Sequence, residues 1–176
     1  MILERLFRPR PAHTAGRTLY ASAVDQARQP ALYAALQAPD TAEGRFEVYT
    51  LHVVILLDRL RGHGPQASET SQGLFDTYVQ SLDDALREMG VGDLSVGKKM
   101  RKLGEAFYGR VKSYEAAFQA LPDVEPLTAL LARTVYTGVD ASQAPALAAY
   151  VLAQREQMAR QPLEPLLGGQ VAWSPA

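Results

Sequence analysis

Apolar residues recur at steps of three and four along most of this chain, the spacing of one buried face of an α-helix. The strongest such stretch runs from Thr41 to Gly62, and we expect it to form the central helix, with Asp40 or Thr41 as its N-cap. The β-branched run at 53–55 would also suit a buried strand. The apolar span is too long for a strand, however, and its period is closer to 3.6 than to 2.

Prolines, glycines and capping residues divide the rest of the chain into further helices. The expected helices cover 19–28, a short segment opening at Pro30, 68–89, 95–118, 125–138 and 142–160. We therefore predict an all-α, single-domain helical bundle of about seven helices. The bundle spans 19–161, after an N-terminal segment at 1–18 and before an irregular tail at 162–176 in which Trp173 folds back.

Composition narrows the class of protein. The chain has 176 residues, 47% of them hydrophobic, which is enough for one packed core, and its net charge of -1 argues against nucleic acid binding over the whole surface. The absence of cysteine excludes disulfides, thiol nucleophiles and thiolate metal ligands. No stretch reaches the ~20 apolar residues needed to cross a bilayer. The N-terminus, with Ile2, Leu3, Leu6 and Phe7 beside three arginines, predicts a docked or frayed end, with contact to an anionic membrane as the alternative.

The lysines are the most unevenly placed residues of the chain. All four fall between Lys98 and Lys112, where six basic residues face Glu105 alone and the local charge is +5. The preceding helix carries -4, so the two segments either neutralise each other or form two distinct faces. Lys98 and Lys99 lie near a helix start, where the exposed N–H groups already attract anions. An anion-binding face is one interpretation, and an ordinary solvated surface is the other.

Catalytic and metal-binding patterns are missing from the sequence. His13, His52 and His63 do not have metal-ligand spacing, and there is no G-x-S-x-G motif or P-loop. We expect no enzyme activity, metal, cofactor or small-molecule substrate. His52 is expected in the core, whereas a helical enzyme would require a deep polar pocket around it. Gly104 and Gly109, inside a predicted helix, indicate a close backbone approach or a local break.

Several segments resemble the ubiquinol–cytochrome c chaperone family. Residues 45–52 read Arg-Phe-Glu-Val-Tyr-Thr-Leu-His, and residues 86–96 read Leu-Arg-Glu-Met-Gly-Val-Gly-Asp-Leu-Ser-Val. They are followed by Lys98-Lys99-Met100 and Phe107-Tyr108-Gly109-Arg110. The resemblance extends from about Tyr33 to Phe118, and its specific parts are Arg-Glu-Met-Gly-Val-Gly-Asp and Tyr-Gly-Arg.

The resemblance implies an α-helical, non-enzymatic assembly factor that binds newly made cytochrome b on its way into respiratory complex III. It also implies a bacterial member acting in the cytoplasm, peripheral to the inner membrane. The ribosome and an anionic membrane surface are further candidate partners, and a nucleic-acid or ribosome-binding helical module is the alternative function. We expect polar partner contacts from Lys98, Lys99, Arg101, Lys102 and Arg110. Tyr49, His52 and Tyr108 are weaker candidates, for which we favour a place in the core.

Overall fold

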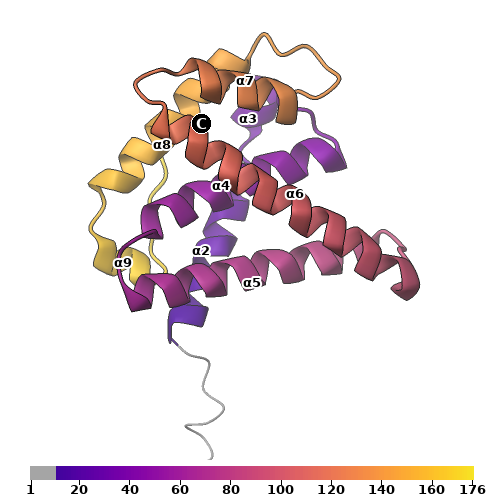
Figure 1. Ribbon diagram of the computed structural model, residues 1–176, viewed down its shortest axis with the longest axis horizontal. Helices are drawn as coiled ribbons and strands as arrows, with labels where there is room; N and C mark the ends of the chain where they lie inside the picture. Colours follow the sequence, from indigo (N-terminus) through magenta and orange to yellow (C-terminus); the bar gives the residue numbers. More distant parts are fainter. Residues whose placement is uncertain (1–10) are drawn as a thin grey trace, which may run out of the picture.

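The computed structural model describes residues 11–176, and this part of the chain contains helices and turns but no strand. The prediction of an all-α single domain is confirmed (Figure 1). Eight helices are described instead of about seven, because a short helix occupies part of the segment expected to be irregular. In chain order the helices are α2 (Pro11–Ala27), α3 (Pro30–Ala34), α4 (Ala42–Leu60), α5 (Pro65–Glu88), α6 (Asp93–Gln119), α7 (Glu125–Thr134), α8 (Ala144–Arg160) and α9 (Leu163–Leu167).

Helix α4 lies at the centre of the fold, as its apolar pattern predicts. Every residue from Thr50 to Leu56 is buried, so the helix is enclosed on all sides over two turns. Its start is fixed by Thr41, whose side chain accepts a hydrogen bond from the Gly44 amide at 3.1 Å. Helices α2, α5, α6 and α8 all pack against α4.

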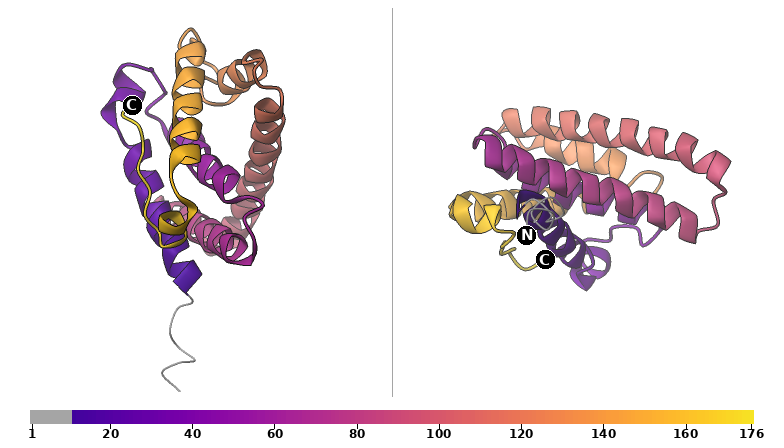
Figure 2. Two further views of the ribbon diagram at one scale, coloured as in Figure 1. Left: turned by 90° about the vertical axis from the view of Figure 1, so that its left-hand side faces the viewer. Right: turned by 90° about the horizontal axis from the view of Figure 1, so that it is seen from below.

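Helices α5 and α6 form a long hairpin. The turn that joins them, residues 89–92, projects beyond the rest of the molecule, and Figure 2 shows this end of the hairpin standing clear of the other helices. The half of the hairpin that lies farther from this turn packs on α4, and α7 and α8 pack against each other. The projecting end therefore has solvent on several sides.

Two helices begin earlier than the sequence patterns predict. Helix α2 already includes Pro11, the first described residue, ahead of the expected Leu19, and α5 starts at Pro65, inside the expected loop that ends at Ser68. A proline is favoured at the first helical position because its missing N–H needs no partner there. The expected serine cap of α5 is therefore wrong, and Gly64 occupies the N-cap position.

The start of α6 also differs from the prediction. Its N-cap is Gly92, which makes no side-chain cap, whereas Asp93 or Ser95 was expected. Asp93 instead lies in the first turn and accepts a hydrogen bond from Arg87 at 2.6 Å. The end of α5 and the start of α6 are thereby joined across the turn.

Close backbone approach occurs at Gly16 and Gly73, not at the glycines of α6. A Cβ atom on Gly16 would lie 2.3 Å from the backbone nitrogen of Leu74, and one on Gly73 would lie 2.7 Å from the Cα of His13. Helix α6 is unbroken, and a Cβ on Gly104 or Gly109 would meet nothing within 4 Å. The expected role of those two glycines is wrong, and α2 and α5 are the helices in near-backbone contact.

The last residues fold back across α2 and α8. The Trp173 indole N–H donates to the Ser22 hydroxyl at 3.0 Å, which confirms its predicted return to the bundle. The Ser174 carbonyl accepts hydrogen bonds from Gln26 at 3.0 Å and from Gln154 at 2.9 Å. Residues 162–176 are therefore fixed to the bundle, although only Leu163–Leu167 is helical.

No helix between residues 11 and 176 combines the length and the apolar character required to span a bilayer. The suggested membrane contact of Ile2, Leu3, Leu6 and Phe7 falls outside the described residues.

The α2–α5 contact generates the first prediction. Gly16→Ala places a methyl group against the α5 backbone, which cannot rotate away as a side chain would, and should lower the free energy of unfolding by about 2 kcal/mol. The matched control, Gly104→Ala, adds a methyl group to a helix in open space and should stabilise by up to ~1 kcal/mol. Urea unfolding of both variants provides the measurement, and equal effects would contradict the contact.

Candidate partner-binding site

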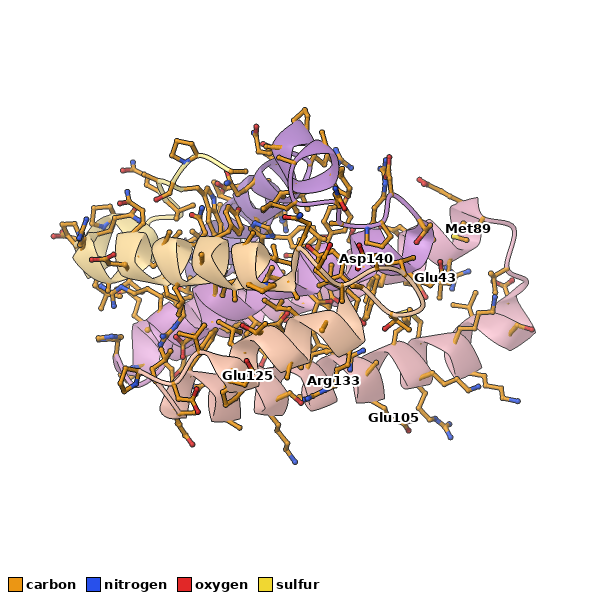
Figure 3. The ribbon with its side chains drawn as sticks, turned by 90° about the horizontal axis from the view of Figure 1, so that it is seen from above. Glu43, Met89, Glu105, Glu125, Arg133 and Asp140 are labelled. Atoms are coloured by element: carbon orange, nitrogen blue, oxygen red, sulfur yellow. The ribbon has the colours of Figure 1, made fainter. Side chains whose placement is uncertain are left out.

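Four of the predicted contact residues form an exposed basic surface on the first half of α6. We call Lys98, Lys99, Arg101 and Lys102 the α6 cationic face, and all four are exposed. Among residues 11–176 none of the four takes part in a salt bridge. Glu105, also exposed, points from the outer side of α6 in Figure 3. These unpaired cations are available to an anionic partner.

The acidic residues of α5 do not neutralise this face. Asp83 pairs with Arg87 at 2.6 Å, Asp84 accepts from Gln80 at 2.9 Å, and Asp76 accepts from Gln72 at 2.6 Å. Each of these contacts is made within α5. Among residues 11–176 no acidic side chain of α5 forms a salt bridge with the α6 cationic face, so the structure shows no direct pairing between them.

Arg110 is not a free contact residue. Its Nε and Nη2 atoms donate to the two carboxylate oxygens of Glu47 on α4, at 2.8 and 2.7 Å. These hydrogen bonds raise the pKa of the Arg110 guanidinium. Glu47 is buried, and a buried carboxylate is costly unless it is paired. The Arg110 side chain thus joins α6 to α4, and a partner contact by its exposed part stays a prediction.

His52 is part of the core, as favoured from the sequence. It is fully buried, with Nδ1 2.8 Å from the Val48 carbonyl and Nε2 2.7 Å from the Tyr150 hydroxyl. A carbonyl can only accept, so Nδ1 carries the hydrogen and Nε2 accepts from Tyr150. Burial lowers the pKa of His52 to about 4, which keeps the ring neutral. Its nitrogens are therefore both occupied, unlike those of a histidine in an open polar pocket.

Tyr49 lies at the edge of the core. Its side chain is half-buried on α4, and its hydroxyl accepts a hydrogen bond from Arg28 Nε at 3.2 Å. The ring packs against the core cluster. Tyr49 therefore links α4 to Arg28, the residue directly after α2, with part of its surface still in solvent.

Tyr108 lies outside the core, so the prediction that favoured burial is wrong. Its side chain is 58% exposed, and its ring is 5.8 Å from that of Phe75 and 5.9 Å from that of Phe107. Adjacent helical residues point about 100° apart, and Phe107 already occupies the inward position. Tyr108 forms one wall of a surface groove of about 400 Å³, whose other lining residues include Leu57, Leu60, Arg61, Gln72, Phe75 and Val111.

Met89 is a surface residue that the sequence pattern did not single out. It lies in the hairpin turn and is 67% exposed, the largest value among the exposed large apolar residues of the described chain. Figure 3 shows it at the turn end of α5. The sequence did offer a signal for its exposure, since Met89 directly precedes Gly90, a residue type that commonly ends a helix. In the structure Gly90 has a positive φ of 79° and lies in the turn after α5.

Three comparisons with known proteins found similar sequences or structures. A family model described as "Ubiquinol-cytochrome C chaperone" matches residues 34–173. The mouse (Mus musculus) protein named "Ubiquinol-cytochrome c reductase complex assembly factor 1" is 27% identical over 160 residues, which cover 89% of this chain and 54% of the mouse protein. The chain thus spans about half the length of this relative. The crystal structure of the Cbp3 homolog from Brucella abortus is similar, with a TM-score of 0.86, 36% identity, and coverage of 99% of this chain and 97% of that one.

The buried histidine generates a prediction of pH dependence. Because the pKa of His52 is about 4 in the fold and 6.5 ordinarily, the unfolded chain binds the extra proton first as the pH falls. The stability from a neutral His52 is fully present above pH 6.5 and is lost as the pH falls towards 4. The loss should reach about 3 kcal/mol. His52→Gln should remove this slope, whereas His63→Gln, a change at an exposed histidine, should leave it in place. Urea unfolding across this pH range measures both.

The Glu47–Arg110 pair generates a second prediction. Arg110→Gln leaves a buried carboxylate without its cation and should lower the free energy of unfolding by about 3 kcal/mol, near the lower limit for a buried pair because Arg110 keeps some exposure. Arg160→Gln, which breaks an exposed pair with Glu156, should change it by less than ~0.5 kcal/mol. If both variants unfold at the same denaturant concentration, Arg110 does not hold α6 to α4.

Proposed function

Since this chain belongs to the ubiquinol–cytochrome c chaperone family, we propose that it binds newly made cytochrome b and promotes biogenesis of the ubiquinol–cytochrome c oxidoreductase. The observation that carries the proposal is the family match across residues 34–173. The fold likeness to the Brucella abortus protein over nearly the full length of both chains supports it. The mouse relative is named as an assembly factor of the same complex.

Two exposed surfaces suit this role in the proposal. The groove beside Tyr108 offers apolar side chains from α4, α5 and α6 to a hydrophobic client segment. The α6 cationic face offers unpaired positive charge to an anionic surface near the client. His52 and Arg110 support these surfaces from inside, because they hold α4 against α8 and α6. Tyr49 is the remaining candidate at the edge of the core.

The proposed activity is binding alone, without a cofactor. The proposed place of action is the cytoplasm, peripheral to the inner membrane into which the client is inserted. His52 is buried, and both of its ring nitrogens are hydrogen-bonded, so the one histidine of the core has no nitrogen left for a substrate. This supports the proposal of a binding protein over that of a helical enzyme.

A nucleic-acid or ribosome-binding module is the second candidate function. The observation that favours it is again the α6 cationic face, whose four unpaired cations lie on one half of one helix. Phosphate contacts by such a face predict RNA affinity that falls steeply with salt. The two functions differ in whether the bound partner survives nuclease treatment.

The chaperone proposal predicts the outcome of an affinity purification from the native cells. The tagged protein should recover cytochrome b from nuclease-treated and untreated lysates alike, because a direct contact with the client needs no nucleic acid. Recovery of ribosomal proteins or nucleic acid without cytochrome b would overturn the proposal in favour of the second function. Tyr108→Ser should lower the recovery of cytochrome b, because it removes the aromatic wall of the groove.

A matched variant tests whether the loss is specific to the groove. Val139→Ser changes another exposed apolar residue, 52% exposed and outside the groove lining, and should recover cytochrome b normally. Circular dichroism of the purified variants checks that both retain the helical fold. Equal recovery by all three proteins would show that the groove does not contact the client.

A further inference from the structure

The turn end of the α5–α6 hairpin exposes an apolar side chain where the molecule projects furthest. Met89 is 67% exposed, and the hairpin around it stands clear of the other helices (Figures 1 and 2). Most apolar residues of comparable size in the described chain are buried or half-buried. A flexible, polarizable methionine side chain at a projecting turn is available to an external apolar partner.

The α6 side of the same end carries positive charge. The α6 cationic face begins nine residues after Met89, and the first turn of α6 adds exposed N–H groups because Gly92 provides no side-chain cap. The acids at this end lie mostly on α5, where Asp83 is paired with Arg87, and Asp93 at the start of α6 is paired with the same arginine. None of them forms a salt bridge with the α6 cationic face among the described residues. The end of the hairpin therefore places an exposed apolar side chain near a set of unpaired cations on α6.

The identity of the anionic partner follows from what each candidate offers. Nucleic acid would satisfy the cations, but its phosphate backbone offers no apolar surface for Met89. The loops of a membrane protein on the cytoplasmic side carry an excess of lysine and arginine, which the α6 cationic face would repel. The interface of an anionic bilayer offers both phosphate groups and an apolar layer at the depth of one side chain.

We propose that the turn end of the α5–α6 hairpin docks the protein on an anionic lipid bilayer. Met89 enters the interfacial layer, and Lys98, Lys99, Arg101 and Lys102 contact lipid phosphates. The inference rests on the proposed function in one respect, since a client inserted in the inner membrane places its chaperone beside lipid. The groove beside Tyr108, further along α6 from the turn, remains open for the client in this orientation.

Vesicle flotation with the purified full chain tests the proposal without any client. The protein should float with phosphatidylcholine vesicles that contain about one third phosphatidylglycerol, should not float with pure phosphatidylcholine, and should release as salt rises. Lys98→Glu with Lys99→Glu should weaken binding about twenty-five-fold or more, because each lysine near an anionic surface contributes a factor of about five. Met89→Ser should weaken binding about five-fold without changing the charge.

Two control variants match these changes elsewhere on the molecule. Lys112→Glu with Arg133→Glu makes the same change in net charge away from the hairpin end, and Val139→Ser removes another exposed apolar side chain. Both should bind vesicles as the unchanged chain does. The proposed docking of the hairpin end on lipid would be overturned if the protein failed to float with anionic vesicles, or if test and control variants lost equal amounts of vesicle binding. Displacement of the protein from vesicles by equimolar RNA would overturn it too.

The flotation result is independent of the chaperone proposal. If the protein binds vesicles but recovers no cytochrome b from cells, the proposed function fails and the docking element stands. If it recovers cytochrome b but does not bind vesicles, the docking element fails and the chaperone proposal stands.

Discussion

The fold depends on the burial of the middle of α4, because a stretch of helix enclosed by its neighbours must find an internal partner for each buried polar side chain it carries. Three such residues lie within two turns, and each is bonded to a different neighbour. Glu47 pairs with Arg110 on α6, Thr50 is hydrogen-bonded to Tyr78 on α5 at 2.7 Å, and His52 bonds Tyr150 on α8. Apolar packing alone would tolerate small shifts of these helices, whereas the three bonds fix which residues face α4.

The segments that identify the family therefore serve the interior more than the surface. The first stretch that resembles the family, residues 45–52, contributes Glu47 and His52, and the Tyr-Gly-Arg segment contributes the partner of Glu47. Within that second segment, Tyr108 and Arg110 have opposite roles, since one faces solvent and the other is held by a buried carboxylate. Because most of the matching residues discussed here pack or bond inside the molecule, the resemblance identifies the fold directly. It locates the partner surface only indirectly.

Local signals in the sequence predicted what depends on neighbouring residues. The all-α class, the central place of α4 and its Thr41 cap follow from periodicity and capping, which operate within a few positions. Contacts between distant segments were not predictable in this way. The partner of Arg110 lies 63 residues away, and the glycines that matter for close packing, Gly16 and Gly73, carry no local mark that distinguishes them from Gly104. The exposure of the α6 cationic face agrees with its charge pattern, whereas that of Tyr108 depends on which of two adjacent aromatic rings faces inward.

The three bonds of α4 also set an order of events during synthesis. Their partners lie 28, 63 and 98 residues along the chain from Thr50, Glu47 and His52 respectively. Because a ribosome delivers the chain from its N-terminus, α5 reaches α4 first, then α6, and α8 last. A partly made chain can thus satisfy Thr50 and then Glu47 while His52 still lacks its tyrosine. The three buried polar residues of the central helix all have their partners only when Tyr150 has left the ribosome.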